Sequence, residues 1–209
     1  MTPAELIAYR DAIAARHASM VEAIGQIAVA SDSVESTDHQ SDAYAEALFL
    51  RAFTAYENDL EKLFLHYVTG GLSLDGKSAN TYLKLTDETA ARRLTKAGYK
   101  FLSWAKPQDI RSTADNYIEN GWPISNMMNA KSQDLSDCER VRNRIAHNSI
   151  EALVSFNTVQ RNLLQTERLV PITPGQFLRI RNRRLKKLHI EHYLDVMDDT
   201  LSAILTPPR

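Results

Sequence analysis

The sequence predicts an all-α protein, a bundle of long helices with a few short extra helices. Glycine and proline are few, with seven of each in 209 residues, and this favours long uninterrupted elements over a β fold with many turns. Apolar residues recur at helical spacing over several stretches, whereas no stretch has the clear alternation of a half-buried strand. The hydrophobic share of 44% is that of a folded chain. We expect a single domain over residues 1–209.

The first part of the chain predicts two long helices joined by a linker. The first helix covers residues 1–30, where Thr2 and Glu5 belong to a helix start signal. Its apolar residues recur near helical spacing: Leu6, Ile7, Ile13, Met20, Val21, Ile24 and Ile27. Residues 31–41 are polar and rich in turn formers, so they predict the linker. The second helix covers about residues 42–68 and ends at "TGG", since glycine commonly follows the last helical turn.

The remainder predicts shorter helices separated by loops. In order, these are a loop over 74–80, a helix over 81–105 interrupted near Gly98, a helix over 107–120, a loop over 121–131, a helix from 136, a loop at "VPITPGQF" and a last helix over 185–205. Ser136 and Glu139 have the spacing of a capping box, so a helix is expected to begin there. Its apolar stripe consists of Leu135, Cys138, Val141 and Ile145. The last helix has a predicted buried face: Leu188, Tyr193, Leu194, Met197, Leu201 and Ile204.

Charge is unevenly distributed, although the net charge is only −1. Residues 1–75 hold 12 Asp and Glu against 4 Lys and Arg, whereas residues 140–187 hold 11 Lys and Arg against 2 acids. A basic segment of this kind suits a surface that faces a polyanion. Alternatively, the acidic segment folds onto the basic one and cancels its charge. Composition leaves both explanations open.

Several classes of protein are disfavoured. No apolar run approaches the length needed to span a bilayer, and the N-terminus lacks the basic start and apolar core of a secretory signal. Cys138 is the only cysteine, so the chain has no internal disulfide, which fits a reducing, cytoplasmic location. His, Cys and acidic residues show no metal-ligand spacing, so we expect no metal and no cofactor.

One acid of the second helix lies on an apolar stripe. Leu50, Phe53, Leu60 and Phe64 form the stripe, and Glu57 is seven residues from both Leu50 and Phe64. A buried carboxylate is costly unless it is paired or protonated, so Glu57 is expected to have a cationic or hydrogen-bonding partner inside the bundle. The alternative is a position at the edge of the stripe, within reach of water.

The stretch "CERVRNRIAHNSIEA", residues 138–152, holds the candidate site. Arg142 and His147 fit the spacing Arg-x-x-x-x-His, but Arg184 and His189 fit it as well. The spacing alone is therefore weak. At 100° per residue, however, His147 points away from the apolar stripe of its helix. Three polar residues spread around the same side: Arg140, Asn143 and Arg144.

Arg142 lies at the margin of that apolar stripe, where it can reach inward to an acid such as Glu57. The helix is expected to end near His147, because Asn148 and Glu151 follow at the spacing of a new capping box. A helix C-terminus favours a protonated histidine. The sequence therefore places an acid–base group and a cation together at the end of one helix.

This combination suits metal-independent cleavage of RNA. A histidine that titrates near neutrality gives or takes a proton, and an arginine holds a phosphate through two hydrogen bonds. One group removes the proton of the ribose 2′-hydroxyl, another protonates the leaving oxygen, and a cation stabilises the phosphate. One histidine can hardly do both jobs in one step, whereas two copies that meet across a two-fold axis can.

The motif "VRNRIAHNS" resembles the signature of HEPN-domain proteins, in which an arginine, usually followed by a polar residue, precedes a histidine by four to six residues. "LRAFTAYENDLEKLF", "TPGQFLR" and "IEHYLDVMDDTLSAI" are similar to segments of the bacterial RiboL-PSP-type branch, and the resemblance covers about residues 42–205. It implies an HEPN-like helical bundle. Many members are ribonucleases of toxin–antitoxin, anti-phage and related stress systems, with a composite active site where two domains meet, and some have lost catalysis.

The resemblance also implies roles for particular residues. Arg142 is the motif arginine, Asn143 its polar companion and His147 the motif histidine, while Glu57 matches an acid of the branch's second helix. HEPN toxins silenced by a nucleotidyltransferase often carry a tyrosine two residues after the histidine, where this chain has Ser149. That form of control is therefore not implied.

We expect a cytoplasmic, homodimeric, metal-independent endoribonuclease of a toxin–antitoxin, anti-phage or stress system, with an antitoxin or regulatory protein as a further candidate partner. His147 is the expected acid–base group, and Arg142 is expected to bind the phosphate. Asn143 is expected to position His147 or Arg142, and Glu57 and Arg144 are supporting residues. The RNA backbone is expected to contact Arg140, Arg144, Arg179, Arg181, Arg183 and Arg184. Two alternatives stay open: a non-catalytic HEPN module that dimerises and binds nucleic acid or a protein, and a DNA-binding regulator that uses residues 179–187.

Overall fold

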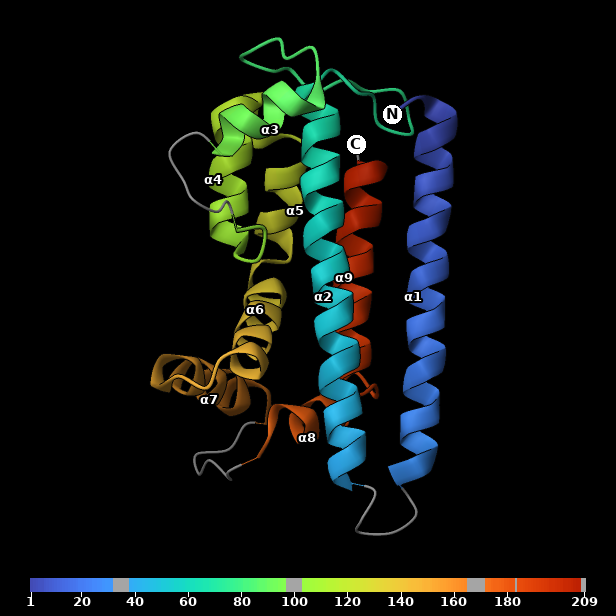
Figure 1. The fold of residues 1–209 in the computed structure, drawn as a ribbon, viewed down its shortest axis with the longest axis vertical. Coiled ribbons are helices and arrows are strands. Elements are labelled where there is room, and N and C mark those ends of the chain that lie inside the picture. Colours follow the sequence, from blue (N-terminus) through green and yellow to red (C-terminus); the bar gives the residue numbers. More distant parts are fainter. Residues whose placement is uncertain (32–37, 97–102, 165–171, 183, 208–209) are drawn as a thin grey trace. The chain divides into compact units, whose positions relative to one another are not determined.

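The described part of the chain is helical, which confirms the predicted all-α class. The computed structural model describes residues 1–31, 38–96, 103–164, 172–182 and 184–207. In these ranges β pairing is limited to isolated bridges, and no helix is both long and apolar enough to cross a membrane. The elements are α1 (Pro3–Ser31), α2 (Asp38–Val68), α3 (Glu88–Lys96), α4 (Pro107–Tyr117), the 3₁₀ turn η2 (Glu119–Gly121), α5 (Ile124–Ala130), α6 (Ser132–Ala146), α7 (Ile150–Leu164), α8 (Pro174–Arg179) and α9 (His189–Leu205) (Figure 1).

The chain divides into two compact units, which are described separately. Unit 1 consists of Met1–Ala14, Ala55–Leu135 and Met197–Arg209, and unit 2 consists of Ala15–Thr54 and Ser136–Val196. The helices α1, α2, α6 and α9 therefore each contribute residues to both units. The single domain over residues 1–209 stays a prediction.

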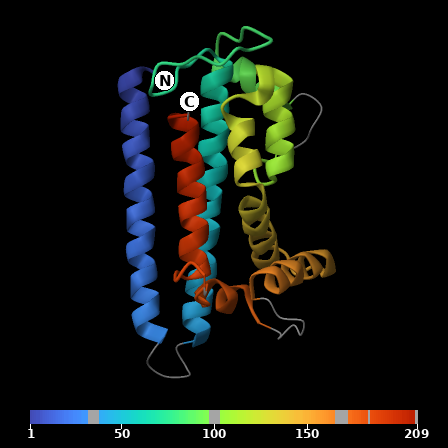
Figure 2. The same cartoon turned by 180° about the vertical axis from the view of Figure 1, so that it is seen from behind.

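In unit 1, the helices α3, α4 and α5 lie beside the C-terminal part of α2 in both views (Figures 1 and 2). Phe64 of α2 is fully buried. Its ring centroid lies 5.2 Å from that of Trp104 and 5.8 Å from that of Tyr117, the second in an edge-on arrangement. Such aromatic pairs add to the hydrophobic free energy of burial. This cluster packs α4 and the residues just before it against α2.

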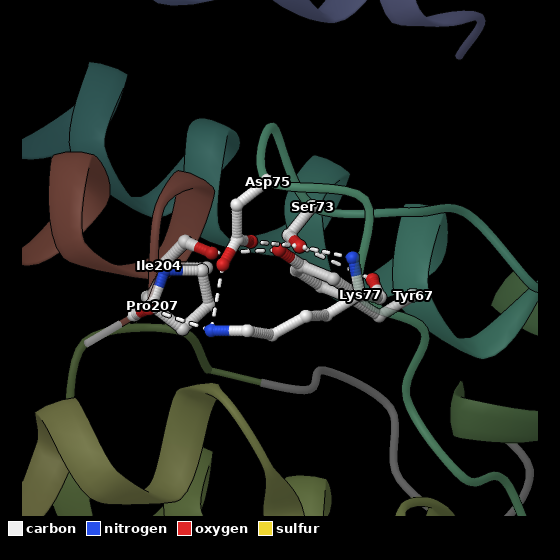
Figure 3. Close-up of polar contacts among 6 residues, drawn as sticks. All are labelled: Tyr67, Ser73, Asp75, Lys77, Ile204 and Pro207. Atoms are coloured by element: carbon white, nitrogen blue, oxygen red, sulfur yellow. Dashed lines mark hydrogen bonds and ion pairs between the residues drawn. The ribbon is translucent and has the colours of Figure 1, made fainter. Parts of the chain in front are cut away.

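The loop after α2 is fastened to the end of α9 (Figure 3). The Ser73 hydroxyl donates to Asp75 Oδ1 at 2.5 Å, and Lys77 Nζ lies 2.6 Å from Asp75 Oδ2. Lys77 Nζ also donates to the carbonyl of Pro207 at 3.3 Å. Tyr67 donates to a backbone carbonyl in the last turn of α9, 2.6 Å away. The Tyr67 bond occupies a carbonyl that a helix end otherwise leaves unpaired. Residues 74–80 contain no helix or strand, as predicted.

The fully buried acid on this part of α2 is Asp59, whereas Glu57 is only half-buried. The Tyr9 hydroxyl of α1 donates to Asp59 Oδ1 at 2.5 Å. Asp59 follows Tyr56 at the three-residue spacing of a buried face, and both are almost fully buried. Glu57 lies at the edge of that face, as the alternative interpretation stated. Its expected cationic or hydrogen-bonding partner inside the bundle stays a prediction.

In unit 2, an aromatic cluster joins α2, α7, α8 and α9. Phe177 of α8 stacks on His189 of α9, with 4.6 Å between the ring centroids and 9° between the planes. Phe156 of α7 meets Phe177 edge-on at 5.5 Å, and Phe49 of α2 lies 5.9 Å from Tyr193 of α9. All five side chains are almost fully buried. Aromatic rings therefore form one part of the core of this unit, beside its aliphatic side chains.

The contact between α8 and α2 is close and partly polar. A Cβ at Gly175 would lie 2.5 Å from the carbonyl oxygen of Asp42, so this position needs glycine. The backbone N–H of Gly175 donates to Glu46 Oε1 at 2.8 Å. Arg179 Nη1 lies 2.5 Å from Asp42 Oδ1, and the two side chains are only 15% and 7% exposed. The helix α8 is thus held by a buried ion pair.

Helix starts and ends agree best with prediction where capping signals are strong. Thr2 and Glu5 exchange side-chain-to-backbone hydrogen bonds at the start of α1, and Gly70 follows α2 with a φ of 86°. The predicted buried face of α9 is confirmed at each position. Of the apolar residues that predicted α1, Ile7 and Val21 are exposed and the others are buried. The helix α2 begins at Asp38, so the linker predicted over 31–41 is shorter; its residues 32–37 lie outside the described residues.

Other boundaries differ from prediction. Residues 81–87 and 103–105 are not helical, and Gly98 lies outside the described residues. The segment at 81 is extended because Thr81 pairs with Ile118 as an isolated bridge. The loop predicted over 121–131 contains α5, whose seven residues are too few for a periodic signal.

Three later elements also differ. The helix α6 begins at Ser132, so Ser136 lies inside it and is not a cap. The segment "VPITPGQF" contains α8, which a capping box of Thr173 and Gln176 starts. The last helix begins at His189 rather than 185, because a bridge between Arg181 and Leu188 closes a turn before it. The missed helix α8 had a readable signal, a threonine and a glutamine three residues apart around a proline.

We predict that His189 makes the fold sensitive to acid. Its side chain is fully buried, and neither ring nitrogen has a hydrogen-bond partner among the described residues. Burial lowers the pKa of His189 to about 4, from an ordinary 6.5. The unfolded chain therefore binds this proton as the pH falls through 6.5, whereas the folded chain resists it down to about 4. The free energy of unfolding should fall across that window, by on the order of 3 kcal/mol.

Urea unfolding at a series of pH values measures this effect in wild type and in His189→Phe. The variant should lose part of the slope between pH 6.5 and pH 4. His147→Ala is the matched control, because His147 is exposed, and it should keep the wild-type slope. Equal slopes for wild type and His189→Phe would show that His189 does not carry the dependence.

Candidate active site

The candidate site lies where α6 ends, in unit 2. Cys138 and Val141 are fully buried on the inner face of α6, as predicted, while Ile145 is half-buried. The last helical residue is Ala146, and the backbone N–H of His147 still donates to the carbonyl of Asn143 at 2.9 Å. The predicted end of the helix near His147 is therefore confirmed.

Only three residues, His147 to Ser149, separate α6 from α7. The N-cap of α7 is Ser149, whose Oγ accepts the backbone N–H of Ala152 at 3.2 Å. The spacing of Asn148 and Glu151 had predicted Asn148 as the cap, and this prediction is wrong. The Asn148 Oδ1 instead accepts from Arg144 Nη1 at 3.0 Å. Ser149 has a structural role as this cap.

Two of the predicted site residues are directly joined. Arg142 Nη1 donates to Asn143 Oδ1 at 3.1 Å, and Asn143 Nδ2 donates to Glu139 Oε1 at 2.5 Å. All three side chains are half-buried on α6. Glu139 was not predicted as a site residue, although its spacing of four residues from Asn143 was a readable signal. The proposed contact of Arg142 with Glu57 stays a prediction.

His147 differs from the other histidine with matching spacing. The side chain of His147 is exposed, and its imidazole makes no hydrogen bond with the residues that the structure describes. His189, the histidine of the Arg184–His189 match, is fully buried against Phe177. A buried imidazole has no access to a phosphodiester, whereas His147 can meet one. The exposure of His147 and the burial of His189 therefore agree with the choice of Arg142 and His147 over Arg184 and His189.

Two of the predicted RNA-binding arginines are engaged in ion pairs. Arg179 is largely withdrawn from solvent by its ion pair with Asp42, and its contact with RNA stays a prediction. Arg140 Nη1 lies 3.0 Å from Oδ1 of Asp137, which is almost fully buried on the same helix. The Arg140 charge is therefore partly neutralised. Both acids are satisfied inside the fold because a buried carboxylate needs a cation or donors.

The turn after α8 presents other cations. Arg181 and Arg184 are exposed, and Arg181 Nη1 donates to the carbonyl of Lys186 at 2.6 Å. Lys187 Nζ lies 2.6 Å from Asp195 Oδ2. Arg183 lies outside the described residues. The basic run over 179–187 is therefore part ion pair and part exposed surface, and not one uniform cationic face.

The first turns of α7 carry an exposed apolar face directly after the site. Ile150 is 77% exposed, Val154 59% and Leu153 40%. These positions are three and four residues apart, so they share one side of the helix. The opposite side, which includes Phe156 and Val159, is buried in unit 2. An exposed face of this kind is typical of a surface that contacts another protein.

Neither the fold nor these contacts alone define a chemistry. The described residues contain no group of three or more His, Cys, Asp or Glu side chains placed to hold a metal ion. No family model, curated protein or solved structure matches the chain. The HEPN resemblance therefore depends on the quoted motifs and stays a prediction.

We predict that Arg179 stabilises the fold, in contrast to the exposed Arg184. Arg179→Ala should lower the free energy of unfolding by about 3 kcal/mol, because it leaves the buried Asp42 carboxylate without its cation. Arg184→Ala removes the same charge from an exposed position and should stay within about 0.5 kcal/mol of wild type. Urea unfolding measures both values. Equal stability of the two variants would contradict the structural role of the ion pair.

Proposed function

We propose that this chain is a metal-independent endoribonuclease that acts as a homodimer. The observation that carries the proposal is the exposed His147 at the end of α6, five residues after Arg142, whose guanidinium donates to its companion Asn143. The HEPN-like motif supplies the expected chemistry. Toxin–antitoxin, anti-phage or stress defence is the proposed setting, with RNA as substrate and an antitoxin or regulatory protein as a further candidate partner in the cytoplasm.

The proposed reaction is an attack of the ribose 2′-oxygen on the adjacent phosphorus. One His147 removes the proton of the 2′-hydroxyl, and the 2′-oxygen forms its bond to phosphorus. The bond from phosphorus to the 5′-oxygen breaks, and the partner subunit's His147 gives that oxygen its proton. Arg142 stabilises the negative charge that gathers on the phosphate oxygens. The products are a 2′,3′-cyclic phosphate and a 5′-hydroxyl.

The need for two histidines makes dimerisation a condition of activity. The exposed face of Ile150, Leu153 and Val154 begins three residues after His147. If this face packs on a second copy, each chain brings its His147 to the edge of the contact. Burial of these side chains would contribute about 25 cal/mol for each Å² of apolar surface removed from water. This placement supports the proposal.

A non-catalytic module is the second candidate, and the same apolar face favours it. An exposed helix face binds a protein without any chemistry at His147. Ion pairs at Arg140 and Arg179 also reduce the cationic charge that could hold RNA. The two candidates differ in what the loss of the imidazole does, since only an enzyme needs it.

We predict that His147→Ala abolishes RNA cleavage. Removal of a group that acts in both proton transfers should lower the rate by at least about a hundredfold. The control is His39→Ala, which removes another exposed histidine of the same unit and should cleave at the wild-type rate. Cleavage of labelled RNA, with and without chelator, measures the effect.

Each outcome of this experiment has a definite meaning. Unchanged cleavage by His147→Ala would contradict the proposed mechanism. Loss of wild-type cleavage in chelator would contradict its metal independence. A homogeneous wild-type protein that binds a partner and cleaves no RNA would favour the non-catalytic module.

We predict that Val154→Glu weakens the homodimer. A carboxylate in an apolar contact must be desolvated, so the dimer Kd should rise at least about tenfold. Asn162→Glu places the same charge at an exposed position of α7 outside the apolar face and serves as the control. Sedimentation velocity over a range of concentrations measures both. Equal dimerisation of the two variants would rule out this face as the contact.

A further inference from the structure

Three side chains of α6 form a continuous hydrogen-bonded chain. Asn143 stands in the middle: its Nδ2 donates to Glu139 Oε1 at 2.5 Å, and its Oδ1 accepts from Arg142 Nη1 at 3.1 Å. Glu139 and Asn143 are four residues apart, so they are neighbours on the helix surface. Glu139 is therefore linked to the proposed phosphate-binding arginine through one side chain.

The chemistry of the three side chains determines which of them donates and which accepts in each hydrogen bond. An ionised carboxylate only accepts hydrogen bonds, and a guanidinium only donates them. The asparagine amide has one donating end and one accepting end, and rotation by 180° about its last bond exchanges them. With the rotated amide, the NH₂ group would face the guanidinium and the carbonyl would face the carboxylate, and both contacts would be unfavourable. Glu139 thus selects the rotamer in which Asn143 can accept from Arg142.

A fixed acceptor matters most for a flexible cation. Arginine loses rotamer freedom when its guanidinium is held in one place. If Asn143 already holds one end of the guanidinium, part of that loss precedes the binding of a phosphate. The arginine is then positioned for the charge that develops during the reaction, and such positioning strongly affects rates.

We infer that Glu139 is a positioning residue of the proposed site: it orients the Asn143 amide and, through it, the Arg142 guanidinium. It touches neither the RNA nor the transferred proton. This inference rests on the proposed ribonuclease function and adds a residue that the motif alone does not indicate. The competing explanation is a helix-surface pair that adds a few tenths of a kcal/mol to stability and leaves the reaction unaffected.

A matched pair of variants separates these explanations. Glu139→Gln keeps an oxygen that can accept from Asn143 Nδ2, and Glu139→Ala does not, while both remove the same charge. We expect Glu139→Ala to lower kcat for RNA cleavage roughly tenfold, with an unchanged pH profile because His147 is intact. Glu139→Gln should recover most of that loss. Equal losses in the two variants would mean that the charge matters rather than the hydrogen bond, and would overturn the inference.

A double-mutant cycle tests whether Glu139 acts through Asn143. On an Asn143→Ala background, Glu139→Ala should have no further effect on kcat. A loss of the same size with and without Asn143 would contradict the proposed route. If wild type cleaves RNA and Glu139→Ala cleaves equally well, the inference fails while the proposed function stands.

A measurement that needs no activity keeps the two ideas apart. In wild type, the two side-chain amide protons of Asn143 should give NMR signals that are well separated and distinct from those of an exposed asparagine. In Glu139→Ala these signals should move toward the values of an exposed asparagine, while Glu139→Gln should stay near wild type. Unchanged signals in Glu139→Ala would overturn the positioning role, even if the protein cleaves no RNA.

Discussion

The short break between α6 and α7 is the constraint on which the candidate site depends. The helix α6 ends at Ala146 with its last backbone bond made by His147, and Ser149 already caps α7. Three residues leave no room for a loop that could fold back over the imidazole. The same break brings the Arg142 network and the exposed start of α7 close together in the chain. A longer connection would have separated the proposed chemistry from the proposed contact with a second copy.

Some charged residues of this chain pair with one another inside the fold, and others are exposed. The ion pair of Asp42 and Arg179 joins the acidic first segment to the basic later one, so part of the asymmetry cancels inside unit 2. Arg181 and Arg184 remain exposed. Cancellation, one of the two explanations that composition left open, is thus partly true, and a surface that faces a polyanion stays a prediction. For RNA binding, the consequence is a small number of exposed cations rather than a continuous basic face, and therefore a modest dependence on salt.

Sequence reasoning was most successful where one physical effect dominates. Helical periodicity and caps located α1, the end of α2 and the buried face of α9. It failed at α5 and α8, which are too short to show a period and depend on packing against longer helices. It singled out Glu57 and did not single out the more deeply buried Asp59, because an ideal wheel does not define the edge of a wide buried face. At the site, it proposed Arg142, Asn143 and His147 by type and spacing, and their roles stay predictions. The role of Glu139 needed the actual rotamers, since the amide of Asn143 is oriented by its two neighbours.

The central claim is that His147 and Arg142 cleave RNA through its own 2′-hydroxyl. The chemical identity of the product ends tests this claim most directly, because it reports which oxygen attacked the phosphorus. Mass spectrometry of a short RNA cleaved by the purified protein should find a 2′,3′-cyclic phosphate on one fragment and a 5′-hydroxyl on the other. A 2′-O-methyl group at the cleaved position should prevent the reaction. Fragments with a 3′-hydroxyl and a 5′-phosphate, or cleavage of the methylated RNA, would contradict the account.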